Sequence, residues 1–114
     1  MILTKEQLKI TKEADRSGIE TLTLSDLADF AGKTPKLRTF SLAELEVGGE
    51  VNFHIHEGEF ESYYIISGSG MYNDNGNEIP VYPGTVTFTP SGEGHGIKNT
   101  GNEKLVFIAL IILD

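Results

Sequence analysis

The chain has 114 residues, no cysteine and a formal net charge of −8 at pH 7. This length accommodates one domain with a buried core but not two, and the lack of cysteine excludes disulfides and thiolate metal sites. The negative charge argues against nucleic acid as a partner and is typical of a soluble globular protein.

The first 35 residues predict only short elements. Thr4–Gln7 (TKEQ) has the pattern of a capping box, which indicates a short helix through Leu8 and Ile10. Charged residues follow Met1 too closely for a signal peptide, so we expect a cytoplasmic protein. The later elements predicted here are a polar loop over 12–18, a strand over 19–24, a helical turn over 25–31 capped by Ser25, and a Gly/Pro break at 32–35.

From residue 36 onwards the pattern is that of short antiparallel strands joined by glycine-containing turns. Alternating and β-branched residues mark the strands, and Asn75-Gly76 between two alternating runs predicts a type I′ hairpin. The glycines at 48 and 49 predict a turn over 46–50. The predicted strands cover 36–45, 51–56, 61–67, 69–73, 77–81, 84–89, 95–99 and 104–113.

The strand over 51–56 contains His54 and His56, two of the three histidines of the chain. Because alternate residues of a strand share a face, Asn52 should lie on the histidine face. The opposite face is apolar and must be covered; it consists of Val51, Phe53 and Ile55.

These histidines and two further residues are candidate metal ligands. Two imidazoles about 6–7 Å apart along one strand can converge on one ion. A turn at 57–59 returns the chain so that Glu61 lies beside them, and a second turn at 90–94 brings His95 inward. Imidazole nitrogens and a carboxylate oxygen suit Fe, Mn, Ni, Co or Zn, and four protein ligands leave one or two positions open around an octahedral ion. The alternatives are histidines with no metal, whose shared spacing would be coincidental, and a bound metal with no role.

The two histidine segments resemble the two sequence motifs of the cupin family. The first motif, G-x5-H-x-H-x(3,4)-E-x6-G, is matched without a gap over 48–68, and the second, G-x5-P-x-G-x2-H-x3-N, is matched at every position over 84–99. The resemblance implies an all-β antiparallel jelly roll (a double-stranded β-helix) with a short N-terminal helical turn. It also implies one cupin domain over 1–114, with an N-terminal arm over 1–35 and a barrel over 36–114. The metal-ligand positions of the family fall on His54, His56, Glu61 and His95.

Cupins that this sequence resembles include dioxygenases, decarboxylases, isomerases, lyases and non-catalytic binding proteins, so the fold does not define the reaction. One hypothesis is a metal-dependent enzyme acting on a small oxygen-rich molecule, of dioxygenase, isomerase or decarboxylase type. The other is a binding or sensing module that holds a sugar-like or acidic ligand at the metal without turnover. Short loops after position 45 predict an open pocket without a lid, and the scarcity of arginine near the motifs disfavours a phosphorylated substrate.

Several polar residues near the motifs have open roles. Glu59 is two residues from Glu61 and competes with it as the carboxylate ligand. Tyr63, Asn52 and Glu59 are candidates for hydrogen bonding or proton transfer beside the ion. Arg38 either points into the cavity and holds an anion or, as we favour, forms a salt bridge at the rim.

The strand over 104–113 is apolar on both faces. In a sandwich of this size only one face can meet the core, so the other needs a cover. At this length the strand cannot cross a bilayer as a helix, and no membrane partner is expected. Together with the outward Phe53 and Ile55, this second apolar face predicts a homodimer. The expected ligand of the metal site is a small molecule.

Overall fold

The computed structural model describes residues 2, 4–12, 17–23 and 35–114. Its described elements are the 3-10 turn η1 (Lys5–Gln7) and the strands β1 (Lys9–Lys12), β2 (Ser17–Thr23), β3 (Leu37–Ile55), β4 (Glu59–Ser67), β5 (Gly70–Asp74), β6 (Asn77–Val81), β7 (Val86–Thr89), β8 (Gly94–Lys98) and β9 (Leu105–Leu113). All strand pairs are antiparallel.

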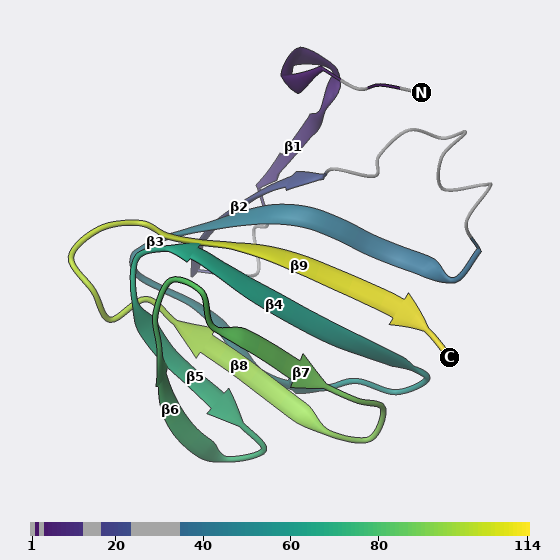
Figure 1. Cartoon of the computed structure of the whole chain (residues 1–114). Helices are drawn as coiled ribbons and strands as arrows, with labels where there is room; N and C mark the ends of the chain where they lie inside the picture. Colours follow the sequence, from purple (N-terminus) through teal and green to yellow (C-terminus); the bar gives the residue numbers. More distant parts are fainter. Residues whose placement is uncertain (1, 3, 13–16, 24–34) are drawn as a thin grey trace.

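The strands form one curled sheet, a half-barrel (Figure 1). The order is β6-β5-β8-β3-β9-β4-β7, with β2 paired to β3 and β1 paired to β2. This arrangement is the predicted all-β jelly roll. The predicted type I′ hairpin is also confirmed, because Asn75 and Gly76 both have positive φ, 52° and 96°, between the paired strands β5 and β6.

The interior face is mainly apolar; its buried polar side chains include the histidine cluster and, away from it, Ser41 and Asn99. Alternate residues of β4 are buried, on the face that the sequence predicts for Glu61 and Ile65. In β9, which the sequence shows to be apolar on both faces, alternate residues are buried and most of those between them are half-buried. The most deeply buried side chains of the core are Leu45, Val51, Ile65, Val81, Ile97, Leu105 and Phe107. This core fixes the strands that carry the histidines.

The predicted turn over 46–50 is wrong, because β3 continues unbroken from Leu37 to Ile55. Its first half pairs with β2 and β9, and its second half pairs with β8. Gly48, with φ of 81°, bends the strand without ending it, and the amide of Gly48 still donates to the carbonyl of Asn99. The strand thus crosses from one half of the curled sheet to the other and carries His54 with it.

The predicted outer face of the histidine strand is also wrong in part. Between Val51 and His54 the pairing with β8 advances three residues on β3 but only two on β8, from Ile97 to His95. This is a β-bulge, and it changes which way side chains point. Val51 is therefore buried in the core, whereas Phe53 and Ile55 point outward as predicted, and within the single chain they are exposed. The side chain of Asn52 is exposed and does not share the histidine face.

The N-terminal helix is shorter than the sequence suggests. The amide of Thr4 donates to Oε1 of Gln7 at 2.9 Å, as in a capping box, but the helical turn ends at Gln7 and Lys9–Lys12 is a strand. Pairing of β1 with β2 supplies hydrogen bonds that compete with a continued helix. The predicted strand over 19–24 is confirmed as β2, which begins at Ser17 within the predicted loop. The helical turn predicted over 25–31 lies outside the described residues. No described helix is long and apolar enough to cross a membrane.

Candidate metal centre

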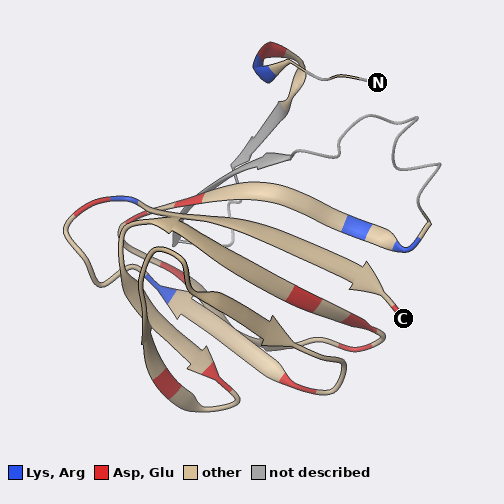
Figure 2. Ribbon diagram, viewed as in Figure 1, with Lys and Arg blue, Asp and Glu red and all other residues tan. Residues whose placement is uncertain are grey.

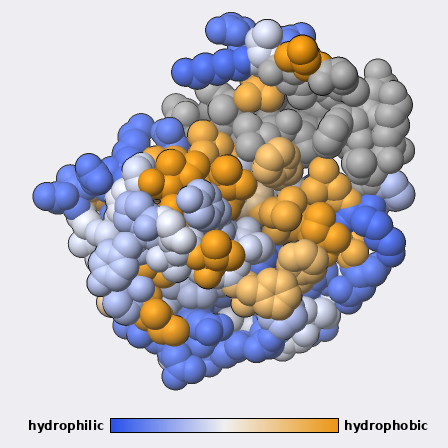
Figure 3. Space-filling model, viewed as in Figure 1, coloured by the Kyte–Doolittle hydropathy of each residue, from blue (hydrophilic) through white to orange (hydrophobic). Residues whose placement is uncertain are grey.

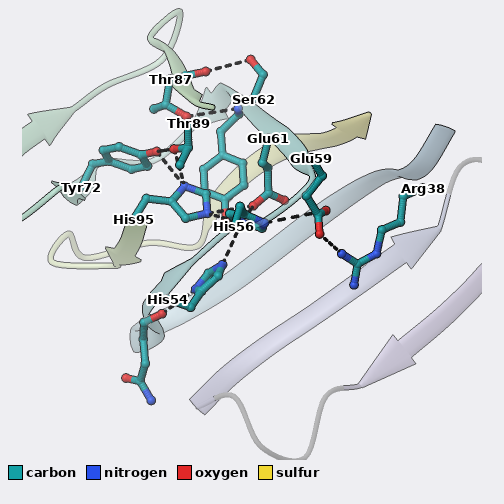
Figure 4. Close-up of polar contacts among 12 residues, drawn as sticks. Arg38, His54, His56, Glu59, Glu61, Ser62, Tyr72, Thr87, Thr89 and His95 are labelled. Atoms are coloured by element: carbon teal, nitrogen blue, oxygen red, sulfur yellow. Dashed lines mark hydrogen bonds and ion pairs between the residues drawn. The ribbon is translucent and has the colours of Figure 1, made fainter. Parts of the chain in front are cut away.

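The four predicted ligands meet at one point inside the half-barrel (Figure 4). His54 lies near the end of β3, His56 follows that strand, Glu61 belongs to β4, and His95 belongs to β8. One ligand atom from each residue lies within 4.8 Å of the others. His56, Glu61 and His95 are buried, and His54 is half-buried at the open side of the cluster.

The spacing of these donor atoms matches the ligand sphere of a transition-metal ion. Nε2 of His56 lies 3.0 Å from Nε2 of His54 and 3.0 Å from Nε2 of His95. Oε1 of Glu61 lies 3.0 Å from Nε2 of His56 and 2.8 Å from Nε2 of His95. Donors about 2.1 Å from a common centre and at right angles to one another are about 3.0 Å apart. The residues present therefore fit an ion, whose identity the donor set does not specify.

The backbone fixes which nitrogen of His54 faces the centre. Nδ1 of His54 lies 2.8 Å from the carbonyl oxygen of Asn52. A carbonyl can only accept, so Nδ1 carries the hydrogen and Nε2 keeps its lone pair for an ion. Burial lowers the pKa of His54 below 6.5; the bond to Asn52 opposes this shift, and the electrostatic influence of the neighbouring His95 and His56 rings adds to it. His54 is therefore neutral at pH 7, as a metal ligand must be.

His95 is held from behind by two hydroxyl groups. Its Nδ1 lies 2.7 Å from the hydroxyl of Tyr72 and 3.1 Å from Oγ1 of Thr89, and these two oxygens lie 2.8 Å apart. Burial raises the pKa of Tyr72, so the phenol stays protonated. The ring of Tyr63 also packs on the imidazole, with ring centroids 5.1 Å apart. Such partners orient a ligating imidazole.

The structure places Glu61, not Glu59, in the cluster. Glu59 instead forms an ion pair with Arg38, and Oε2 of Glu59 lies 3.7 Å from Nδ1 of His56. Figure 2 shows a basic position near the start of β3 and acidic positions near the start of β4, with β9 between the two strands. Arg38 is 55% exposed, so the favoured interpretation of a rim salt bridge is the one that the structure supports.

Two further residues contact His95. From sequence, Tyr72 is favoured as a core or interface tyrosine, with a position in the cavity as the alternative; the structure buries it in β5, and its hydroxyl reaches Nδ1 of His95. Thr89 lies six residues before His95, at the end of β7. For both residues, the sequence feature that could have indicated a role was a polar group at a position on the inward face of a strand. Of the other candidates, Asn52 contributes its backbone carbonyl and not its side chain.

Comparison with known proteins agrees with this geometry. The family model described as a cupin domain matches residues 41–111. An oxalate-binding protein of Thermotoga maritima is 45% identical over 98 residues, covering 86% of this chain and 81% of the relative. A crystal structure of a predicted oxalate decarboxylase from Thermotoga maritima superimposes with a TM-score of 0.85 and 40% identity, covering 100% of both chains. A glucose-6-phosphate isomerase of Thermococcus kodakarensis is 37% identical over 68 residues, which is 55% of this chain but only 36% of that enzyme.

Proposed function

Because this chain belongs to the cupin family, we propose that it binds one divalent transition-metal ion and uses it to hold a small carboxylate of the oxalate class. The ligands would be His54, His56, Glu61 and His95, and the ion would be Fe, Mn, Ni, Co or Zn. The observation that carries the proposal is the convergence of four donor atoms within 4.8 Å of one another.

The number of donors supports a chelating ligand. Four protein donors leave two positions on a six-coordinate ion, and oxalate offers two oxygens that close a five-membered ring with a metal. The bound ion would supply Lewis-acid attraction for the anion. Similarity to the oxalate-binding protein of Thermotoga maritima favours this ligand class.

Two features favour binding without turnover. The connections between β3 and β9, all of which are described, are short, the longest being residues 99–104, and none has the length of an active-site lid. The second buried carboxylate beside the cluster, Glu59, is paired with Arg38. The second candidate is a metal-dependent enzyme of decarboxylase type, which the similarity to a predicted oxalate decarboxylase favours.

Calorimetric titration with oxalate tests the proposal. Metal-stripped protein and protein reloaded with Mn²⁺ or Co²⁺ would each be titrated with oxalate, with acetate as the control that offers one carboxylate only. We expect one oxalate per chain in the loaded protein, at least tenfold weaker binding of acetate, and no binding to the stripped protein. Equal binding with and without metal would contradict the proposal. Release of CO₂ and formate from oxalate would favour the enzyme over the binding module.

We also propose that two copies of the chain associate through the outer face of β7, β4, β9 and β3. Adjacent residues across these four strands are apolar, in the order Val86, Tyr64, Ile108 and Leu42. Val86, Phe88, Tyr64 and Ile66 are exposed by 43–64%, and Figure 3 shows hydrophobic side chains gathered over this part of the molecule. An apolar surface that extends over several strands is typical of a protein interface.

A further inference from the structure

A buried carboxylate stands directly behind the cluster without belonging to it. Glu59 is the first residue of β4, and its side chain is only 9% exposed. Oε1 of Glu59 pairs with Arg38. Oε2 is buried and has no hydrogen-bond partner among the described residues. An unpaired buried carboxylate oxygen is costly, so its position calls for a physical reason.

The direction of this oxygen supplies a reason. Oε2 of Glu59 lies 3.7 Å from Nδ1 of His56, the ring nitrogen that faces away from the cluster (Figure 4). A carboxylate can only accept, so it favours the tautomer of His56 with hydrogen on Nδ1 and a lone pair on Nε2. Nε2 is the atom that lies 3.0 Å from its neighbours in the cluster. A rim salt bridge alone would not require the second oxygen to be buried.

Arg38 completes the arrangement from the outside. It lies on β3 and is 55% exposed, so its charge remains hydrated while it neutralises Glu59. The series Arg38, Glu59 and His56 thus runs from the rim to the cluster, and each side chain orients the next.

We propose that Glu59, held by Arg38, is a positioning residue that sets the tautomer and orientation of His56 for metal binding. This inference rests on the proposed function, because it assigns a role toward the same ion. The positioning role and a general electrostatic effect predict opposite changes in metal affinity when Arg38 is removed. Removing a positive charge near a cation site should tighten binding by Coulomb's law, whereas loss of a positioning partner should weaken it.

Calorimetric titration with Co²⁺ alone tests the inference on four single variants. Glu59→Gln and Arg38→Met remove the two members of the pair. Glu57→Gln removes the same negative charge from an exposed neighbour of His56. Lys36→Met removes a positive charge close to Arg38 in the chain, from a side chain that bonds the carbonyl of Asp114. We expect Glu59→Gln to weaken Co²⁺ binding about 10–100-fold, Arg38→Met to weaken it severalfold, and both controls to stay within twofold of wild type. The inference is overturned if Glu59→Gln matches Glu57→Gln, or if Arg38→Met binds Co²⁺ at least as tightly as wild type.

A second measurement does not depend on bound metal. In stripped, ¹⁵N-labelled protein, the ring nitrogen shifts of His56 report the fraction with hydrogen on Nδ1. We expect this fraction to fall in Glu59→Gln and to remain unchanged in Glu57→Gln; equal fractions in wild type and Glu59→Gln overturn the inference. If wild type binds no Co²⁺ but the Nδ1–H fraction still falls in Glu59→Gln, the proposed function fails while the positioning of His56 stands.

Discussion

At the scale of single residues, the protonation of His54 links the site to pH. Its pKa is lowered below 6.5, chiefly because burial disfavours the imidazolium. A lowered pKa in the folded state means that His54 contributes stability above about pH 6.5, which is lost as the pH falls through its folded value. An NMR titration of the metal-free protein should give His54 a pKa below 6.5, and a value above 6.5 would contradict the environment described.

Tyr72 gives a second test at this scale. Tyr72→Phe removes the hydroxyl that lies 2.7 Å from Nδ1 of His95, while Thr89 remains at 3.1 Å. We expect the unfolding free energy to fall by about 1 kcal/mol and Co²⁺ affinity to fall by about tenfold. Chemical denaturation and calorimetry measure the two effects. An unchanged affinity would mean that Thr89 alone orients His95.

The candidate ligand residues could be predicted from the sequence, whereas the residues that hydrogen-bond or pair behind them could not. Motif spacing identified the residues that the structure gathers into one cluster, because i, i+2 spacing on a strand and a glycine-containing turn are local properties. Contacts such as Tyr72 with His95, or Arg38 with Glu59, join strands far apart in the chain. They depend on strand order, which local patterns do not contain.

At the scale of elements, substitution of two glycines with positive φ distinguishes the cost of backbone strain from the cost of a steric clash. A Cβ on Gly68, with φ of 79°, would lie 2.3 Å from the backbone oxygen of Lys104, whereas one on Gly76, with φ of 96°, would meet nothing within 4 Å. Gly76→Ala should therefore cost only the strain of about 1–2 kcal/mol. Gly68→Ala should cost about 1–3 kcal/mol more, because β4 and β9 must separate. Urea denaturation of both variants measures this, and equal costs would contradict the close approach at Gly68.

The same scale shows where sequence patterns were insufficient. Strand alternation correctly predicted the buried face of β4, whereas it could not distinguish the two faces of β9, because both are apolar. It failed at β3, where a glycine pair looked like a turn and a bulge moved Val51 to the interior. Both features arise because one strand pairs with β9 in its first half and β8 in its second, and neither partner is near it in sequence.

For the whole molecule, the proposed dimer gives a direct prediction. Val86→Glu and Phe88→Glu place charges on the outer face of β7, where both native side chains are at least 60% exposed. We expect wild type to be a dimer and the double variant to be a folded monomer, because burying an unpaired charge in an apolar interface is unfavourable. Light scattering at micromolar concentration measures the mass. A matched change at Ile79, which is 46% exposed on β6 outside this face, should leave the dimer intact.

The measurement that tests the central claim most directly is equilibrium dialysis of the stripped protein against Co²⁺, with metal and protein quantified together. The account predicts one ion per chain in wild type. In His95→Ala, and in His54→Ala, which replaces a half-buried ligand, it predicts a loss of affinity of at least about 100-fold. This loss is larger than the loss expected when only an orienting partner is removed. Circular dichroism confirms that each variant remains folded. Less than a tenth of an ion per wild-type chain at saturating Co²⁺, or unchanged binding in both folded variants, would contradict the assignment of this cluster as a metal site.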